Sequence, residues 1–332
     1  MTPCMAIGRR VFIVALGGAM ANAAGSLASR AQQSAAATIG FLNAGRPPEH
    51  LVASFRKTLA ENGYEEGRNL TIHYRFAEGR YDLLPAMMAD LVQRNVAVIV
   101  ALPTPAALAA KAATTTLPIV FNVPDDPVRL GLVATLPRPG GNATGSSFLL
   151  SELGAKQLGL LRELVPDARR FGLLVNPNNE NVETITAGLR AAAATLGVDI
   201  GVVQARDPRE IEAAFAALLR DRTQALVVGT DPFFFSRRVQ LATLAARHAI
   251  PTVFNARDYA EAGGLMSYGT DLTEGYRQMG VYTARILKGE KPVDLPVVQS
   301  SKFQFVINQP TARALGLAVP PMLLARADEV IE

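Results

Sequence analysis

Cysteine is nearly absent from this sequence of 332 residues, which contains a single one, Cys4. A disulfide needs two cysteines, so the chain has none within itself. Cys4 lies in an N-terminal segment with the features of a cleavable export signal, described below, and it leaves with that segment. The processed chain is therefore expected to have no thiol chemistry, which excludes the amino-acid racemases that use a pair of cysteines.

The patterns that mark common catalytic and metal sites are also missing. The histidines His50, His73 and His248 are far apart, and none lies in an H-E-x-x-H or other metal-binding spacing. The sequence has no G-x-S-x-G nucleophile elbow, Walker A motif or G-x-G-x-x-G motif. We therefore expect a protein without catalytic residues, metal or cofactor.

The N-terminal segment has the parts of an export signal. Arg9 and Arg10 precede an apolar run of 11 residues, Val11 to Ala21, which is too short to span a bilayer as a helix. The stretch Ser29-Arg30-Ala31 places small residues at the −3 and −1 positions of a cleavage site, so residues 1–31 are expected to be a signal peptide. The arginine pair, with Phe12 two residues later, resembles a twin-arginine signal, but no Ser or Thr precedes the pair, so the Sec route stays open. The alternative is a buried N-terminal helix.

Charge gives little support for binding to nucleic acid. The full chain carries 33 Lys and Arg against 29 Asp and Glu, a net charge of +4. Residues 1–31 contain Arg9, Arg10 and Arg30 and no acid, so the processed chain keeps 30 basic and 29 acidic side chains, a net charge of +1. No basic field remains to attract nucleic acid. Without a second long apolar segment, we expect an exported soluble protein, or one held outside the cytoplasm by a partner.

A short motif occurs twice. The stretches "LPIVFNVPD" at 117–125 and "IPTVFNARD" at 250–258 both fit [LI]-P-x-V-F-N-x-x-D, and they lie 133 residues apart. Each has a short apolar run, typical of a buried strand, followed by polar residues. In the first copy two acids, Asp125 and Asp126, come just after the strand.

Strands and helices are expected to alternate along most of the chain, which predicts an α/β fold of βαβ units with parallel sheets. The pattern runs twice, which predicts two Rossmann-like lobes over roughly 36–150 and 165–265, with the repeated motif as the fourth strand of each. Expected strands are 38–44, 69–75, 96–102, 118–122, 169–177, 198–204, 224–229 and 251–255. Expected helices are 50–62, 81–94, 105–113, 182–196, 208–220 and 233–248.

The C-terminal residues are too few for a third lobe and are expected to complete the first two. An amphipathic helix over 271–292 is followed by one more strand and helix. We expect about 270–295 to complete the N-terminal lobe and about 300–332 the C-terminal lobe. The chain then crosses between the lobes near 145–155, 268–272 and 295–305, as a multi-crossing hinge.

Ligands of open parallel sheets bind beyond the carboxyl ends of the strands, where the polar residues of the motif are expected. Asp125 has no local task there and is our candidate to contact a ligand ammonium group. Asp126 has two candidate roles, since Asp126-Pro127 is also a good helix start. Thr104 and Pro105 begin another expected helix, whose free N–H groups suit a carboxylate, although an ordinary capped helix fits equally.

Polar residues also follow expected strands of the second lobe. Asn176 and Asn178 are candidates to hold a zwitterion or to form turns, and Asn179 favours a turn. Asp231 ends a strand before three phenylalanines, of which a helix buries at most two on one face, so the third is a candidate pocket wall. Tyr268 is expected at a strand end beside a lobe crossing.

Several stretches together resemble the ABC-transporter substrate-binding proteins, a family that includes tryptophan- and other aromatic-amino-acid-binding members. They are "TLAENGYEEGRNLTIHYRFAEGRYDLLPAMMADLV", "DPVRLGLVATLPRPGGNATG", "GGLMSYGTDLTEGYRQMGVYTARILKGEKPVDLPV" and "PPMLLARADEVIE". The resemblance covers nearly the whole chain, and it implies a periplasmic-binding-protein type I fold. It also implies two lobes that close on a small ligand, expected to be an aromatic or other amino acid, and deliver it to a membrane permease driven by a separate ATPase. With the export signal, we expect a periplasmic monomer. By that resemblance a ligand role falls on Asn43, Thr104, Asp125, Asn176, Asp231 and Tyr268.

Two other classes remain open. The effector domain of a lac-repressor-type regulator shares the fold, but a helix-turn-helix is then expected where the signal segment lies. An exported hydrolase needs an activated nucleophile and base, and no such pair is visible.

Overall fold

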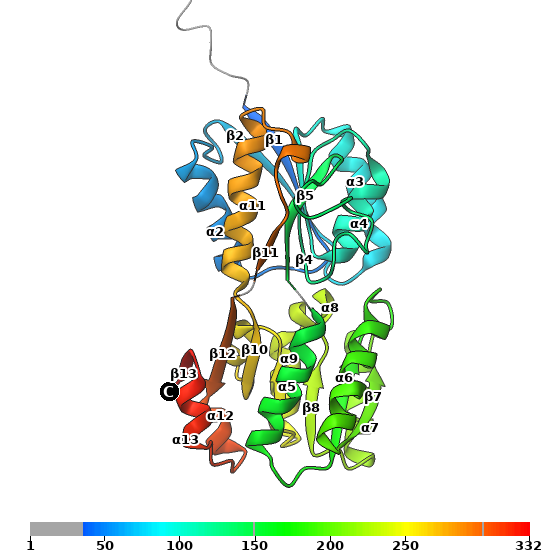
Figure 1. Cartoon of the computed structure of the whole chain (residues 1–332), viewed down its shortest axis with the longest axis vertical. Helices are drawn as coiled ribbons and strands as arrows, with labels where there is room; N and C mark the ends of the chain where they lie inside the picture. The colour runs from blue at the N-terminus through cyan, green and yellow to red at the C-terminus, as the bar shows by residue number, and fades with distance from the viewer. Residues whose placement is uncertain (1–35, 149, 301) are drawn as a thin grey trace, which may run out of the picture. The chain divides into compact units, whose positions relative to one another are not determined.

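The computed structural model describes residues 36–148, 150–300 and 302–332 (Figure 1). Every helix and strand named below lies in one compact unit, Ala37–Glu332. The expected signal peptide, 1–31, lies outside the described residues. No helix in the described ranges is long and apolar enough to cross a membrane.

The first lobe is built on a six-stranded sheet in the order β11-β5-β4-β3-β1-β2, with all neighbours parallel. Its strands are β1 (Ala37–Asn43), β2 (Leu70–Phe76), β3 (Val98–Leu102), β4 (Ile119–Val123), β5 (Ala143–Phe148) and β11 (Val298–Ser300). Its helices are α2 (Glu49–Glu61), the short η1 (Tyr81–Leu83), α3 (Leu84–Gln93), α4 (Thr104–Ala113) and α11 (Leu272–Leu287). The 3-10 turn η2 (Pro292–Asp294) leads into β11.

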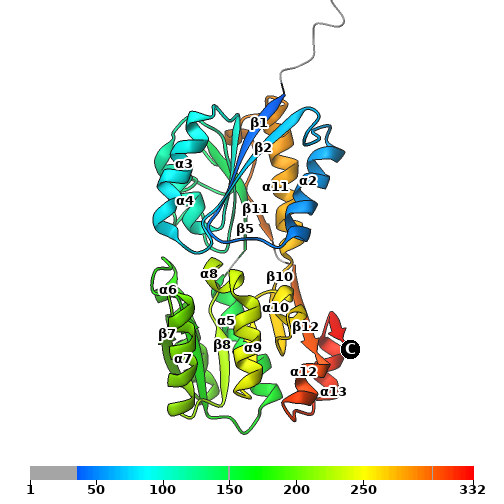
Figure 2. The ribbon, with the colours of Figure 1, turned by 180° about the vertical axis from the view of Figure 1, so that it is seen from behind.

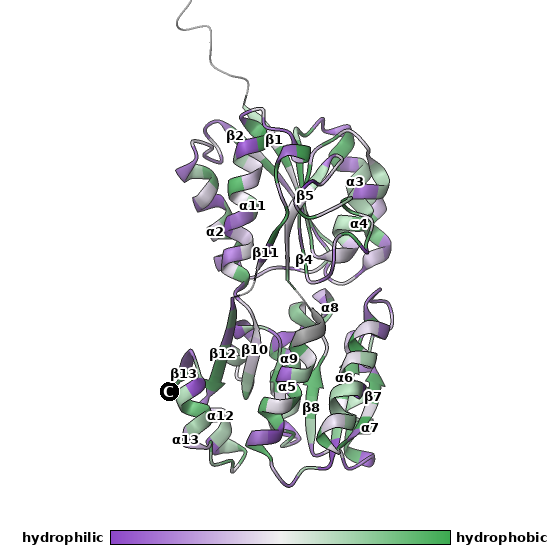
Figure 3. Ribbon diagram, viewed as in Figure 1, coloured by the Kyte–Doolittle hydropathy of each residue, from purple (hydrophilic) through white to green (hydrophobic). Residues whose placement is uncertain are grey.

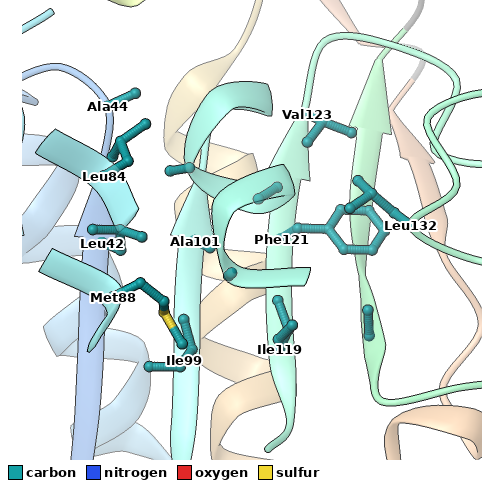
Figure 4. Packing of buried hydrophobic residues seen from close by; sticks show 14 of the residues in the cluster. Leu42, Ala44, Leu84, Met88, Ile99, Ala101, Ile119, Phe121, Val123 and Leu132 are labelled. Carbon is teal, nitrogen blue, oxygen red and sulfur yellow. The ribbon is translucent and has the colours of Figure 1, made fainter. Parts of the chain in front are cut away.

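Both faces of this sheet are buried, which explains its continuous apolar strands. On one face, Leu42, Ile99 and Phe121 project from β1, β3 and β4 into a cluster with Leu84 and Met88 of α3 (Figure 4). The residues between them on the strands point to the opposite face. There, side chains of β1, β3 and β4 pack against α2 and α11.

The second lobe has a seven-stranded sheet in the order β13-β12-β10-β9-β8-β6-β7, parallel except for the antiparallel pair β10 and β12 (Figure 2). Its strands are β6 (Arg170–Val175), β7 (Asp199–Gln204), β8 (Ala225–Val228), β9 (Thr252–Phe254), β10 (Met266–Thr270), β12 (Phe303–Asn308) and β13 (Glu329–Ile331). Its helices are α5 (Leu150–Leu164), α6 (Val182–Leu196), α7 (Pro208–Arg220), α8 (Pro232–Ser236), α9 (Arg238–Arg247), α10 (Arg257–Glu261), α12 (Gln309–Ala314) and α13 (Pro321–Arg326). Hydrophobic residues are concentrated in strands such as β8 and β12 (Figure 3).

The repeated motif forms β4 and β9, the fourth strand of each sheet in chain order, as the sequence predicts. The chain passes between the sheets three times, after β5, after β10 and after β11. All three crossings fall inside the ranges expected from the sequence. The prediction of two Rossmann-like lobes joined by a multi-crossing hinge is therefore confirmed.

Some local expectations are wrong. The residues after Asp126 form turns, because Leu132 and Val133 both donate to the Pro127 carbonyl and Gly131 takes a positive φ of 70°. The helix expected over 233–248 is two helices, α8 and α9, because the Ser236 hydroxyl bonds the Pro232 carbonyl where α8 ends. Helix α5 packs against the second sheet although it precedes residue 165.

Candidate ligand-binding site

A cavity of about 830 Å³, including the space open to solvent at its mouth, lies between the strand-end loops of the two lobes. Its polar lining consists of amides and hydroxyls with two charged residues. They are Asn43, Thr104, Asn122, Asn179, Asn181, Thr230, Asn255, Thr270 and Tyr276, with Arg46 and Asp231. Apolar walls come from Leu51, Leu102, Phe148, Phe235 and Leu272, and from Pro47, Pro103, Pro105, Pro124 and Pro232. The volume falls in the range of small-molecule sites.

The repeated motif supplies one asparagine to this cavity from each lobe. Asn122 lies in β4, and Asn255 directly follows β9. The Asn122 amide lies over Gly275 of α11, where an added Cβ would sit 2.3 Å from its Nδ2. The Oδ1 of Asn255 and the Oγ1 of Thr270 are buried, and neither has a hydrogen-bond partner among the described residues. A polar ligand group can satisfy these two oxygens.

Aromatic rings of both lobes border the cavity. Phe233 and Phe234 are buried in the second-lobe core, whereas Phe235 lines the cavity, as expected for the third phenylalanine. Its ring lies edge-on to Tyr259 at 5.8 Å between centroids. Tyr276, from α11, packs on Phe41 of the first-lobe core at 6.4 Å. These contacts fix two flat apolar surfaces of the cavity.

Asp231 lies at the cavity and holds its polar groups in place. Its carboxylate accepts hydrogen bonds from Tyr81 Oη (3.0 Å), Asn176 Nδ2 (3.1 Å) and Asn179 Nδ2 (2.8 Å), and from the N–H groups of Phe233 (2.9 Å) and Phe234 (3.4 Å). These five donors fill the lone pairs that a carboxylate offers. Burial raises the pKa of Asp231, and the hydrogen bonds from the asparagines and Tyr81 oppose that rise.

Asn43 is the last residue of β1 and Asn176 directly follows β6, the first strand of the second lobe, so the two lie 133 residues apart like the repeated motif. Each accepts a hydrogen bond at Oδ1 from the N–H two residues on, that of Gly45 (2.8 Å) and of Asn178 (3.0 Å). Asn43 lines the cavity and donates to the Tyr276 hydroxyl at 3.4 Å. Asn176 lies behind the cavity and reaches it only through Asp231.

Thr104 lines the cavity, but its hydroxyl donates to Asp125 Oδ2 (3.0 Å) and does not cap α4. The expectation that this helix presents several free N–H groups is wrong. Pro103 and Pro105 have no N–H, and Ala106 and Ala107 both donate to the Pro103 carbonyl at 3.1 Å. The turn therefore offers at most the Thr104 N–H to a ligand.

Asp125 lies outside the lining of the main cavity. It borders a neighbouring space of about 470 Å³, and its Oδ2 also accepts from Asn181 Nδ2 at 2.5 Å. Burial raises the pKa of Asp125, against the hydrogen bond from Thr104, the charge of Arg129 and the hydrogen bond from Asn181. Its predicted contact with a ligand ammonium stays a prediction, and its contacts point to another role, argued below.

Three further candidates lie away from the main cavity. Asp126 is exposed, and its Oδ1 accepts the Val128 N–H (2.9 Å) in a turn. Asn178 is exposed and donates its N–H to Asn176. Tyr268 lies in the middle of β10, and its ring stacks on Phe303 at 5.7 Å. The expectation that Tyr268 ends a strand is wrong, because β10 continues to Thr270.

Several contacts join the lobes around the cavity. Tyr81 donates to Asp231, and the Arg46 N–H donates to Ser236 Oγ at 3.0 Å. Asn181 of the second lobe donates to Asp125 of the first, and His50 Nε2 of the first lies 3.5 Å from Asp258 Oδ1 of the second. The lobes are thus closed on the cavity.

Several lining residues were not predicted from the sequence. Asn122 and Asn255 lie in the repeated motif, but the predicted ligand contact was the acid that follows in the first copy. Asn179 was predicted to form a turn, which its Oδ1 does form with the Asn181 N–H (2.9 Å), although its Nδ2 also bonds Asp231 at the cavity. Tyr276 gave no signal, because it lies inside a helix distant in sequence from the first lobe.

Two lobes with parallel-rich sheets and a cavity between their strand ends define a solute-binding protein of the periplasmic binding protein type I fold. Residues 48–331 match the family described as ABC transporter substrate binding protein, and the chain belongs to that family.

Relatives with named ligands are similar over most of the chain. A tyrosine-binding protein of Clostridioides difficile (strain R20291) is 28% identical over 263 residues, 79% of this chain and 75% of that protein. The structure of an ABC domain from Streptococcus pneumonia in complex with L-Trp is 28% identical, with a TM-score of 0.80 over 89% of this chain and 99% of that one.

The ligand-free, open structure of a substrate-binding protein with adhesive properties from Clostridium difficile is 26% identical over the same shares of the two chains, with a TM-score of 0.63. The higher similarity to the L-Trp complex agrees with the contacts that join the two lobes here.

Proposed function

We propose that this protein is the exported, monomeric binding component of an ABC importer and that it binds an aromatic amino acid between its lobes. It would deliver the ligand to a membrane permease driven by a separate ATPase, act in the periplasm after loss of residues 1–31, and bind neither nucleic acid nor a cofactor. In this role it binds and releases its ligand without chemical conversion.

The observation that carries this proposal is the composition of the cavity lining. Amides and hydroxyls both donate and accept, so Asn122, Asn255 and Thr270 suit the ammonium and carboxylate groups of a zwitterion. Phe235 and Phe148 suit an aromatic side chain. A flat ring between such surfaces gains free energy from burial and from ring contacts.

Charge in the lining supports a ligand without net charge. The Arg46 guanidinium pairs with Glu78, at 2.6 Å from its Oε1. The Asp231 carboxylate is occupied by five donors. A ligand of net charge would therefore lack an unpaired counter-charge in the lining, whereas a zwitterion needs none.

The relatives support the same ligand class, since one is named for tyrosine and another holds L-Trp. We assign direct contacts to Asn43, Asn122, Asn255, Thr270, Phe235 and Tyr276, which line the cavity. Asp231, whose carboxylate is occupied by its five donors, and Asn176 behind it would fix the positions of Asn179 and of α8, which carries Phe235.

Titration calorimetry of the processed protein against the common L-amino acids tests this function. We expect binding of L-tryptophan or L-tyrosine at micromolar concentration or below, with L-leucine and L-arginine weaker by at least tenfold. Preference for a charged or small amino acid would refute the aromatic assignment. Failure of every amino acid to bind would refute the amino-acid class.

A further inference from the structure

The acids that end the two copies of the repeated motif, Asp125 and Asp258, occupy equivalent places. Each lies three residues after the asparagine that lines the cavity and just beyond the fourth strand of its lobe. Both side chains are buried, with 4% and 8% of their residue surface exposed. Neither acid lines the main cavity, so ligand contact does not account for the pair.

Asp125 reaches across the boundary between the lobes. Its Oδ2 accepts a hydrogen bond at 2.5 Å from Asn181, the N-cap residue that directly precedes α6 in the second lobe. Arg129, four residues after Asp125, strengthens the contact. Its guanidinium lies 3.7 Å from Asp125 Oδ1 and donates to Asn181 Oδ1 at 3.3 Å.

Asp258 makes the corresponding contact in the opposite direction. Its Oδ1 lies 3.5 Å from Nε2 of His50, the second residue of α2 in the first lobe. The other charges that act on Asp258 come from Arg238 and Glu261 of its own lobe. Across the boundary, His50 is therefore the group that Asp258 pairs with.

The two contacts have the same plan. Helices α2 and α6 each follow the first strand of their lobe, and each receives the acid of the other lobe at its first turn. The contacts exist only while the lobes are together, because each joins residues of different lobes.

We infer that Asp125 with Asn181 and Asp258 with His50 are two latches, positioning residues that hold the lobes closed without touching the ligand. This inference rests on the proposed function, in which closure traps a ligand. A contact made only in the closed state raises the fraction of closed protein, and ligand leaves through the open state. The latches therefore act mainly on the rate of ligand release.

Two conservative variants test the latches. Asp125→Asn removes the carboxylate that Asn181 and Arg129 contact. Asp258→Asn removes the carboxylate that lies beside His50. Stopped-flow measurement with L-tryptophan and L-tyrosine should show dissociation faster by about 10- to 100-fold for Asp125→Asn. For Asp258→Asn, whose partner is half exposed, we expect about 1.5- to 5-fold. Association rates should change less than twofold.

A swap separates a latch from a general structural role. Asp125→Asn combined with Asn181→Asp restores an amide donor facing a carboxylate, and the new carboxylate still faces Arg129. We expect this double variant to recover at least half of the lost residence time on a logarithmic scale. For the second latch, His50→Ala combined with Asp258→Asn should cost no more than Asp258→Asn alone.

Matched controls are Glu183→Gln in the first turn of α6 and Glu212→Gln on α7. Both are exposed acids, and neither makes a contact across the lobes in the described structure. Both should release ligand at the parent rate. Small-angle scattering at saturating ligand should show a larger radius of gyration for the two latch variants than for parent or controls.

The latch inference and the proposed function fail in different ways. If no amino acid binds the parent protein, the proposed function is wrong. Small-angle scattering of the ligand-free protein then tests the latches. Asp125→Asn should increase the radius of gyration, and the swap should restore the parent value. Unchanged dissociation rates and unchanged radii of gyration in folded Asp125→Asn and Asp258→Asn proteins would overturn the latches. Loss of binding that the swap fails to restore would also overturn the first latch.

Discussion

Replacement of Phe235 by alanine tests the aromatic wall of the cavity most sharply. Phe235 is the one ring of its phenylalanine triplet that lines the cavity, and it is held in place by Tyr259 behind it. Phe235→Ala removes a flat apolar surface from the ligand while leaving the polar lining unchanged. The loss should therefore appear in affinity for aromatic ligands above all.

The size of the effect follows from the area lost. One face of a phenyl ring covers about 60–100 Å² of apolar ligand surface, worth about 1.5–2.5 kcal/mol at 25 cal/mol per Å². That free energy corresponds to about 10- to 70-fold weaker binding. Phe235→Leu keeps part of the area and should lose only severalfold.

Calorimetry with L-tryptophan and L-tyrosine measures this change, and thermal unfolding without ligand checks that the variant is folded. Val239→Ala is the matched control, since Val239 is 59% exposed on the next helix and does not line the cavity. It should bind as the parent does. Affinity of a folded Phe235→Ala protein within twofold of the parent would refute the placement of the ligand ring against Phe235.

Other residues of the account are open to similar tests. Asn255→Ala and Asn122→Ala should each weaken ligand binding by about 5- to 150-fold in calorimetry, because each removes a buried hydrogen-bonding group; unchanged affinity in both would show that the motif asparagines do not contact ligand. Gly275→Ala places a Cβ 2.3 Å from Asn122 Nδ2, so affinity should fall even though the chain still folds, and full affinity would contradict that packing. Burial raises the pKa of Asp125, so as pH falls from about 7 to about 4 the native protein takes up a proton before the unfolded chain does. The melting temperature of the parent should therefore rise relative to that of Asp125→Asn over this range. A fall in the melting temperature of the parent relative to the variant would contradict the assigned pKa shift. N-terminal sequencing of the protein from the periplasmic fraction should give Gln32 as the first residue. A full-length protein in the cytoplasm would refute export.

The sheets were predictable because their strands are apolar throughout. Runs such as those of β3 and β4 can be buried on both faces only in a parallel sheet covered by helices. The repeated motif then fixed equivalent positions in the two lobes. A pocket wall among the three phenylalanines could also be predicted, since helical periodicity leaves one ring of three outside the core, and that ring is Phe235.

The partners of the polar residues were not predictable in the same way. Asp125 is bonded to Asn181, 56 residues away and in the other lobe, and no local pattern reports that contact. Tyr276 meets Asn43 across 233 residues, because a C-terminal helix returns to the first lobe. Local sequence favours the acid of the motif as the ligand contact, whereas in the structure Asp125 bonds the other lobe and Asn122 lines the cavity.

Native mass spectrometry of protein purified without refolding tests the central claim most directly. The account predicts a 1:1 complex whose released ligand has the mass of tyrosine or tryptophan, and addition of that amino acid to stripped protein should reduce the radius of gyration in scattering. A co-purified sugar, nucleotide or charged amino acid would contradict the claim, as would stripped protein that neither binds an aromatic amino acid nor closes on it.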